Sequence, residues 1–180
     1  MSAVRRLNWG CGAAGEPGWV NSDVKQGPQI DVPADILAGL PLGDETFDYA
    51  VSIHALPELP LDAQVPALAE LRRVLKPAGV LRLALPDLLK GVDAYRRGER
   101  DYFLVPDEDA EALGAKLITQ LLWYGYSKTL FVPDFVEELL RRAGFDDVRH
   151  VAYRATTTAH AGITELDNRE AESLFVEAVK

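Results

Sequence analysis

The amino-acid sequence predicts an α/β fold built on one mostly parallel sheet. Short apolar segments of strand length alternate with amphipathic segments of helical period, which is the pattern of α/β proteins. A glycine-rich turn, Gly10–Gly15, directly follows the first predicted strand. The connections after the first two strands are too short for helices of ordinary length. We therefore expect reduced helical cover after these two strands.

Composition limits the class of protein. The 180 residues include 19 Lys and Arg against 28 Asp and Glu, a net charge of −9, and 48% are hydrophobic. This length predicts a single domain over residues 1–180. No apolar run approaches the roughly 20 residues of a membrane span, and the first residues lack the pattern of a signal peptide. The acidic charge disfavours phosphate backbones. We expect a cytoplasmic protein with no nucleic-acid and no membrane partner.

The single cysteine, Cys11, restricts the redox and metal chemistry. One cysteine cannot form an intrachain disulfide and cannot supply a thiolate cluster for zinc. No metal site is predicted.

Four strands are expected in the first third of the chain. Turn residues separate them, and Pro33 makes the third an edge strand or an irregular one. The four strands are Val4–Trp9, Trp19–Val24, Ile30–Ile36 and Phe47–Ile53.

The hydrophobic period changes after residue 60. Val65, Leu68 and Leu71 recur at helical spacing, and Lys76–Gly79 ends the run, which predicts a helix over Asp62–Leu75. The remaining expected elements are a strand at Val80–Leu85, helices at Asp107–Tyr124 and Pro133–Arg142, and strands at Asp147–Tyr153 and Leu174–Val179.

The residues that end the strands are the candidates for binding, because ligands of open α/β sheets bind beyond the carboxyl ends of the strands. Gly10 and Gly12 allow a ligand to approach the backbone closely. Asp23 and Asp35 lie near the ends of the second and third strands. Two carboxylates suit a ligand with hydroxyl and amine donors, each such hydrogen bond being worth about 1.5–3 kcal/mol. They suit an inorganic phosphate poorly.

The letters GCGAAG at residues 10–15 also match the dinucleotide pattern G-x-G-x-x-G. That pattern requires a helix that begins within the motif and an acidic residue about 20 positions later. Pro17 and Gly18 interrupt the segment, and Asp23 lies 13 residues after Gly10. A nucleotide-dependent oxidoreductase or sugar-nucleotide enzyme is therefore the least favoured interpretation.

Several segments follow one another in a specific order: LNWGCG, GWVNSD, ADI, LPLGDETFDYAVSIHAL, LRRVLKPAGVLRLALPDL and LLRRAGFDDV. This order resembles the class I S-adenosylmethionine-dependent methyltransferases, in particular a small bacterial branch of the type 11 group. The resemblance covers residues 7–88 and resumes at 131–148. It implies a Rossmann-like sheet of the seven-strand type and S-adenosylmethionine as cofactor. The sequence departs from the family at Leu56-Pro57-Glu58, where Leu-Glu-His is frequent.

The resemblance also implies a cofactor site. Gly10 and Gly12 would lie beneath the methionine and ribose, and Asp23 would bind the ribose hydroxyls. Asp35 would accept from the exocyclic amine of adenine. The expected cofactor contacts are Asn8, Trp9, Gly10, Cys11, Gly12, Asp23, Val24, Asp35, Ile36, Ser52, Ile53 and His54.

Two residues are candidates for acid–base chemistry. His54 follows the fourth strand, and histidine titrates near neutral pH. Asp87 follows the fifth strand, at the same expected cleft, and is also a candidate for contact with the acceptor. Tyr124 and Tyr126 are expected to form an aromatic wall over the acceptor. A base is needed only for a hydroxyl or a protonated amine, and a mechanism without one fits the sequence equally well.

We therefore expect methyl transfer to a small-molecule acceptor of small or middle size. The alternative is a non-catalytic protein that binds S-adenosylmethionine or S-adenosylhomocysteine, as a sensor or partner subunit. Residues 90–130 are expected to form a helical insertion that covers the cofactor cleft or the sheet. The helix over residues 107–124, or a second subunit of a homodimer, would cover the sheet face that lacks helices.

Overall fold

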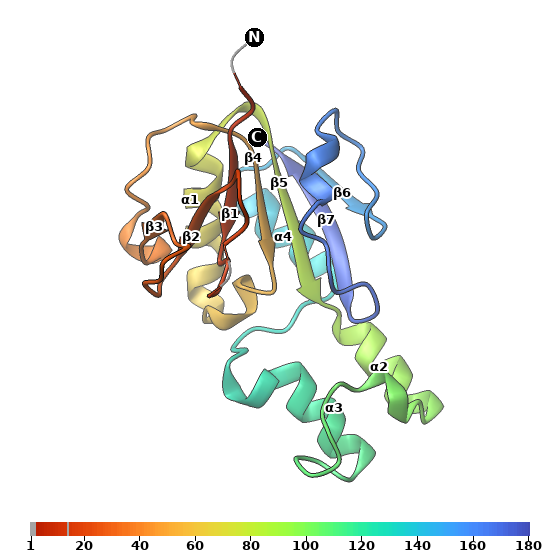
Figure 1. Ribbon diagram of the computed structural model, residues 1–180. Coiled ribbons are helices and arrows are strands. Elements are labelled where there is room, and N and C mark those ends of the chain that lie inside the picture. Colours follow the sequence, from red (N-terminus) through yellow and green to blue (C-terminus); the bar gives the residue numbers. More distant parts are fainter. Residues whose placement is uncertain (1–2, 14) are drawn as a thin grey trace.

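The computed structural model describes residues 3–13 and 15–180 and contains one seven-stranded sheet (Figure 1). The strand order is β3-β2-β1-β4-β5-β7-β6. Neighbouring strands are parallel except at β7, which runs antiparallel to both β5 and β6. The prediction of a mostly parallel sheet of the seven-strand type is confirmed. The strands are β1 (Arg6–Trp9), β2 (Val20–Asp23), β3 (Val32–Pro33), β4 (Phe47–Ile53), β5 (Leu75–Pro86), β6 (Asp147–Val151) and β7 (Ser173–Val179).

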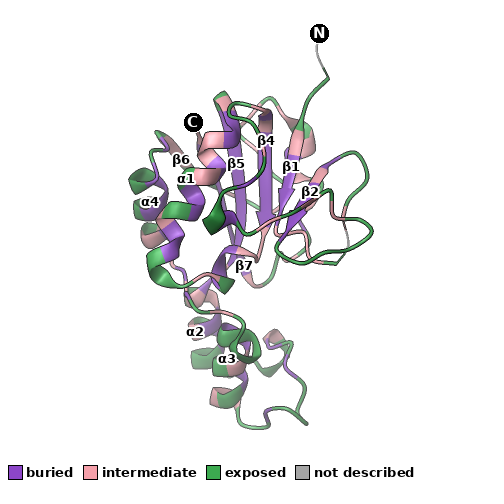
Figure 2. Ribbon diagram, turned by 90° about the vertical axis from the view of Figure 1, so that its left-hand side faces the viewer, coloured by how far each residue is buried: buried purple, intermediate pink, exposed green. Residues whose placement is uncertain are grey.

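The four α-helices of the described residues lie in two places. Helices α1 (Gln64–Val74) and α4 (Pro133–Arg142) pack on one face of the sheet, whereas α2 (Leu88–Arg97) and α3 (Leu113–Leu122) lie beyond the carboxyl ends of β4 and β5 (Figures 1 and 2). In the described part of the chain, no helix is long and apolar enough to span a bilayer.

Most of the predicted elements are present, and four differ. Strand β5 begins at Leu75, before the predicted start at Val80. The third strand keeps only Val32–Pro33, because Asp35 then caps a short 3-10 helix, Ile36–Ala38. The helix expected from residue 107 begins at Leu113, after an extended residue. Helix α2 was not predicted, although its signals were in the sequence: Asp87 accepts a hydrogen bond from the Leu89 amide, and Gly98 ends the helix in the left-handed region.

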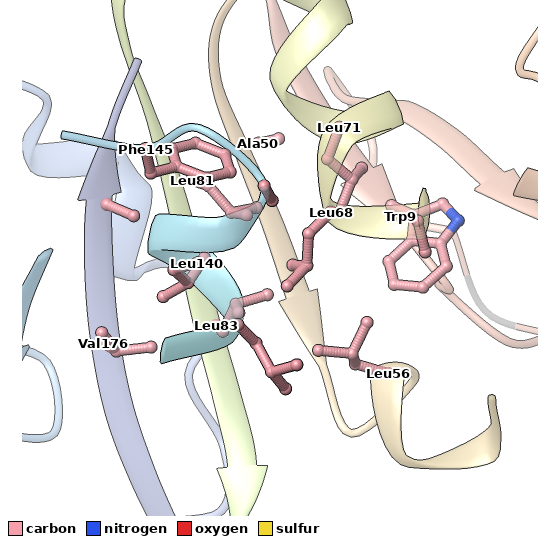
Figure 3. Close-up of a cluster of buried hydrophobic side chains, with 14 of the residues drawn as sticks. Trp9, Ala50, Leu56, Leu68, Leu71, Leu81, Leu83, Leu140, Phe145 and Val176 are labelled. Carbon is pink, nitrogen blue, oxygen red and sulfur yellow. The ribbon is translucent and has the colours of Figure 1, made fainter. Parts of the chain in front are cut away.

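The main core lies between the sheet and helices α1 and α4 (Figure 3). Leu81, Leu83 and Leu85 alternate along β5 with residues that face the other way, as the two-residue period of a strand requires. They pack with Leu68 of α1 and Leu140 of α4. This packing fixes the edge of the sheet at which β4 and β5 end.

The opposite face of the sheet is covered by the connection between β6 and β7, residues 152–172. Ile163 and Leu166 from this connection pack against Trp19, Tyr49 and Val51. Within the described residues, no helix joins β1 to β2 or β2 to β3. The expectation that the helix at 107–124 covers this face is wrong, because α3 lies beyond the strand ends (Figure 2).

A buried charged cluster attaches this connection to the sheet. The side chain of Arg82, which is fully buried, points from β5 toward the connection and donates hydrogen bonds to the carboxylates of Asp167 and Glu177 at 2.9 and 2.8 Å. Arg82 also donates to the carbonyl oxygen of Ala155, and Asp167 accepts from the Arg154 amide. Strand β5 is therefore joined at one guanidinium group to three places in residues 154–177, all more than 70 positions away in sequence.

Replacing Arg82 should destabilise the fold strongly. The substitution Arg82→Met leaves two buried carboxylates without a cation, and breaking a buried pair in this way costs about 3–5 kcal/mol. The measurement is the free energy of unfolding in urea. The control is Glu138→Gln, which removes an exposed pair with Arg142 on α4 and should cost less than about 1 kcal/mol. An equal loss of unfolding free energy in both variants would contradict the conclusion that Arg82 attaches the connection between β6 and β7 to the sheet.

Candidate functional site

A cavity of about 830 Å³ lies at the carboxyl ends of β1, β2, β4 and β5. This is where open α/β sheets bind their ligands, and the volume is within the range of small-molecule sites. Loops of the first half of the chain form one end, and the α2–α3 region forms the other. Of the residues predicted from the sequence, the cavity is lined by Asn8, Trp9, Gly10, Cys11, Gly12, Asp23, Val24, Asp35, Ile36, Ile53, His54, Asp87 and Tyr126.

The turn after β1 requires its two glycines for different reasons. At Gly10 (φ +71°), an added Cβ would lie 2.1 Å from the Cβ of Ala55, so any side chain would collide with the loop after β4. At Gly12 (φ +65°), an added Cβ meets no atom within 4 Å, so this backbone faces open space. The Gly12 amide donates to Asp23 Oδ2 at 2.8 Å, which joins the ends of β1 and β2.

The carboxylates of Asp23 and Asp35 both border this end of the cavity. Asp23 also accepts from the Lys25 amide at 2.9 Å, and Asp35 uses one oxygen to accept from the Leu37 amide at 2.9 Å. Val24 and Leu37 line the cavity with side chains that are 67% and 46% exposed. Exposed apolar side chains beside carboxylates suit a flat ring that carries polar groups. Leu37 was not predicted, because nothing in the sequence distinguishes it from a core residue.

Three neighbours of the glycines have mainly structural contacts. The Asn8 side chain donates to Asn21 Oδ1 at 3.1 Å, and the indole of Trp9 packs in the main core (Figure 3). Burial and the nearby Asp23 carboxylate raise the pKa of the Cys11 thiol to about 11. The thiol therefore stays protonated at neutral pH and is a poor nucleophile.

His54 occupies an unusual position at the end of β4. Its backbone is in the left-handed region (φ +56°), and its amide donates to the carbonyl oxygen of Ala84 at 3.0 Å. Its Nε2 shares a hydrogen bond of 2.7 Å with Ser173 Oγ. Burial, helped by the positive charge of Arg169, lowers the pKa of His54 to about 3. The ring is therefore neutral at physiological pH, and so low a pKa makes it a weak proton acceptor.

Asp87 lies where β5 meets α2. It is 9% exposed and lines the cavity, and its Oδ1 caps α2 by accepting from the Leu89 amide at 2.9 Å. The α2–α3 region adds an apolar and aromatic wall, which consists of Tyr102, Phe103, Leu117, Leu121 and Trp123. An aromatic wall was predicted from the cluster at residues 123–126, whereas Tyr102 and Phe103 were not singled out in the sequence.

Two predicted residues lie outside the cavity. Ser52 is fully buried, and its hydroxyl has no hydrogen-bond partner in the described part of the chain. Tyr124 points away and donates to Asp109 Oδ2 at 2.6 Å. The cause is local, since α3 ends in three consecutive left-handed residues, Trp123–Gly125. This reversal places Trp123 and Tyr126 on the cavity in place of Tyr124.

Comparisons with known proteins agree with this geometry. The family model described as "Methyltransferase domain" matches residues 9–83. The protein named "Probable methyltransferase ltbC", from Aspergillus luteorubrus, is 32% identical over 145 residues, which are 78% of this chain and 47% of that protein. A S-adenosylmethionine-dependent methyltransferase from Archaeoglobus fulgidus has a TM-score of 0.59 at 16% identity, covering 98% of this chain and 86% of its own. The chain therefore has the fold of the class I S-adenosylmethionine-dependent methyltransferases, and residues 9–83 match the model of a methyltransferase domain.

The family accounts for the fold and for the cofactor class. S-adenosylmethionine is the cofactor of class I methyltransferases, as the sequence predicted. The chain spans about half the length of the curated relative it matches, and the bacterial branch stays a prediction. The structure of the [4+2]-cyclase SpnF is also similar, with a TM-score of 0.55 at 18% identity over 99% of this chain and 75% of its own. The fold alone therefore does not determine the reaction.

The partly buried His54 should make stability depend on pH. A folded-state pKa of about 3 is below the unfolded value of about 6.5, so the unfolded chain binds more protons between these values. Stability attributable to His54 is then complete above pH 6.5 and falls as the pH decreases toward 3. The change His54→Asn, which tolerates the positive φ, should remove this dependence.

The measurement is urea unfolding of both proteins between pH 7.5 and 4. Below pH 6.5, the free energy of unfolding of the wild type should fall relative to that of His54→Asn, by at most about 1.4 kcal/mol per pH unit. Parallel stability curves across this range would show that the ring is not buried in its neutral form.

Proposed function

We propose that this chain binds S-adenosylmethionine at the glycine end of the cavity and transfers its methyl group to an acceptor at the α2–α3 end. The observation that carries the proposal is the convergence of the open Gly12 backbone with the carboxylates of Asp23 and Asp35 on one side of the cavity. The remaining volume extends past His54 and Asp87 to the aromatic wall. One cavity thus offers adjoining space for a cofactor and an acceptor.

The residues present suit the cofactor. Asp23 would accept from the ribose hydroxyls. Asp35 keeps one oxygen without a hydrogen bond from the described chain, and this oxygen would accept from the exocyclic amine of adenine. Val24 and Leu37 would contact the adenine ring. Inorganic phosphate does not suit this pair of carboxylates, and the described chain has no helix after β1 to direct its amino end at a pyrophosphate.

Alignment is the main contribution that the protein makes to the reaction. Bound S-adenosylmethionine supplies a methyl group that its sulfonium already makes electrophilic, so holding the acceptor in line with it can lower the barrier by up to about 7–11 kcal/mol. We infer that residues 90–130 wall the acceptor and exclude water. We propose that neutral His54 orients groups at the junction by hydrogen bonding, and that Asp87 is the carboxylate nearest the acceptor.

Titration calorimetry tests the cofactor assignment directly. S-adenosylmethionine and S-adenosylhomocysteine should bind with micromolar affinity, and NADH should not bind. If neither S-adenosylmethionine nor S-adenosylhomocysteine binds, the proposal is overturned. Binding without turnover on a panel of acceptors would instead favour the non-catalytic sensor or partner subunit.

The substitution Asp35→Asn should weaken S-adenosylhomocysteine binding at least about tenfold. Asparagine keeps an oxygen for the Leu37 amide but presents an NH2 group, which cannot accept from the adenine amine. Loss of one hydrogen bond to a charged group costs about 1.5–3 kcal/mol. S-inosylhomocysteine, which lacks that amine, should lose less affinity in the variant.

The control for this measurement is Asp62→Asn, which removes the same charge from an exposed residue outside the cavity. If S-adenosylhomocysteine and S-inosylhomocysteine lose equal affinity in Asp35→Asn, Asp35 does not contact the amine of the adenine ring.

A further inference from the structure

The end of the cavity away from the glycine turn has its own charge pattern. We call this end the acceptor pocket. It is lined by His54, Asp87, Tyr102, Phe103, Leu117, Leu121, Trp123, Tyr126, Arg169 and Glu172.

Two acidic residues, Asp87 and Glu172, occupy opposed backbone positions at the base of the acceptor pocket. The amide of Asp87 donates to the carbonyl oxygen of Glu172 at 2.9 Å, directly beyond the pairing of Pro86 with Ser173. These two residues therefore continue the antiparallel ladder between β5 and β7, in which opposed side chains project from the same face. Like charges in opposed positions are destabilising, so this arrangement needs positive charge nearby.

The protein supplies that positive charge to only one of the two carboxylates. Arg169 pairs with Glu172 at 2.9 Å. The nearby ammonium group of Lys90 donates to the carbonyl oxygens of Ser173 and Glu170, and Lys128, on the cavity rim, is exposed. Among the described residues, no cation lies within 4.0 Å of the Asp87 carboxylate, although this side chain is only 9% exposed.

The other wall of the acceptor pocket suits a cation with an apolar body. The rings of Tyr102, Phe103 and Trp123 border the space together with two leucines of α3. Aromatic faces attract ammonium groups electrostatically. Burial and the charges of Glu172 and Asp87 raise the pKa of Tyr102 to about 12, so its hydroxyl stays neutral and adds no negative charge to the pocket.

We propose that the acceptor is a small amine whose ammonium group binds to Asp87 and whose aromatic or aliphatic body packs against the wall formed by α3 and residues 102–103. This inference rests on the proposed function, because it assigns a ligand class to the acceptor end of the same cavity. The ammonium nitrogen has no lone pair, so it anchors the acceptor, and the methyl group would pass to another nucleophilic atom of the acceptor. The carboxylate of Asp87 accepts its hydrogen bonds through the oxygen that α2 does not use.

Asp87 also caps α2, so the test must separate the cap from the charge. Asparagine caps a helix as well as aspartate does. The substitution Asp87→Asn therefore keeps the bond to the Leu89 amide and removes the negative charge. The matched control is Asp93→Asn, an exposed residue of the same helix that does not line the cavity.

The experiment titrates 2-phenylethylamine, 2-phenylethanol and 3-phenylpropanoate into the protein saturated with S-adenosylhomocysteine. The amine should bind at least about tenfold more tightly than the alcohol, and the carboxylate should not bind. Asp87→Asn should remove the preference for the amine and leave S-adenosylhomocysteine affinity unchanged, while Asp93→Asn should behave as wild type.

Two results would overturn the inference. One is an amine that binds no more tightly than the alcohol, or not at all. The other is a preference for the amine that survives Asp87→Asn. Failure of S-adenosylhomocysteine to bind in the preceding saturation step would overturn the proposed function, and this outcome is read separately from the amine titration.

Discussion

The buried contact between Arg82 and the carboxylates of Asp167 and Glu177 is the constraint on which the rest of the structure depends. One face of the sheet is covered by helices, but the short connections after β1 and β2 leave nothing for the other. The connection between β6 and β7 takes that place, and with few apolar residues it needs a polar anchor. Because the Arg82 guanidinium is fully buried, the free-energy cost of removing it from water is offset only when all of its hydrogen-bond partners are in place. The second face therefore forms cooperatively with the sheet.

The same anchor helps to build the cavity. Asp167 is followed at once by Asn168 and Arg169, which line the cavity, and then by Glu172, the residue before β7. A chain segment that completes the hydrophobic core on one side thus delivers polar groups to the carboxyl edge of the sheet. One short segment therefore contributes both to the stability of the fold and to the cavity. For substitutions around Arg82, both the free energy of unfolding and ligand affinity should be measured.

Local signals in the sequence predicted most of the fold and the glycine end of the cavity. The strand ending at Trp9, the turn at Gly10–Gly12 and the carboxylates at Asp23 and Asp35 are neighbours in sequence order as well as in space. The acceptor pocket was predicted only in part, at His54, Asp87 and Tyr126, because tertiary packing alone brings Tyr102 and Glu172 to the same cavity. The prediction that Tyr124 lies on the acceptor wall was wrong. The predicted helix was continued to Tyr124, but the backbone turns into the left-handed region at residues 123–125, and hydrophobic periodicity does not reveal such a turn. Helix α2 was missed although its cap residues, Asp87 and Gly98, were readable.

The charge at Asp87 needs an explanation beyond the helix that it begins. Asparagine and serine cap helices about as well, and the helix dipole favours a negative cap by only about 0.3–1 kcal/mol. Withdrawing an ion from water costs several kcal/mol, and Asp87 is only 9% exposed and lies opposite Glu172. The cap therefore accounts for a polar side chain at this position and does not account for the choice of a carboxyl group. A cationic ligand in the cavity would offset the cost of this charge, since Asp87 lines the cavity and α2 uses only one oxygen of its carboxylate.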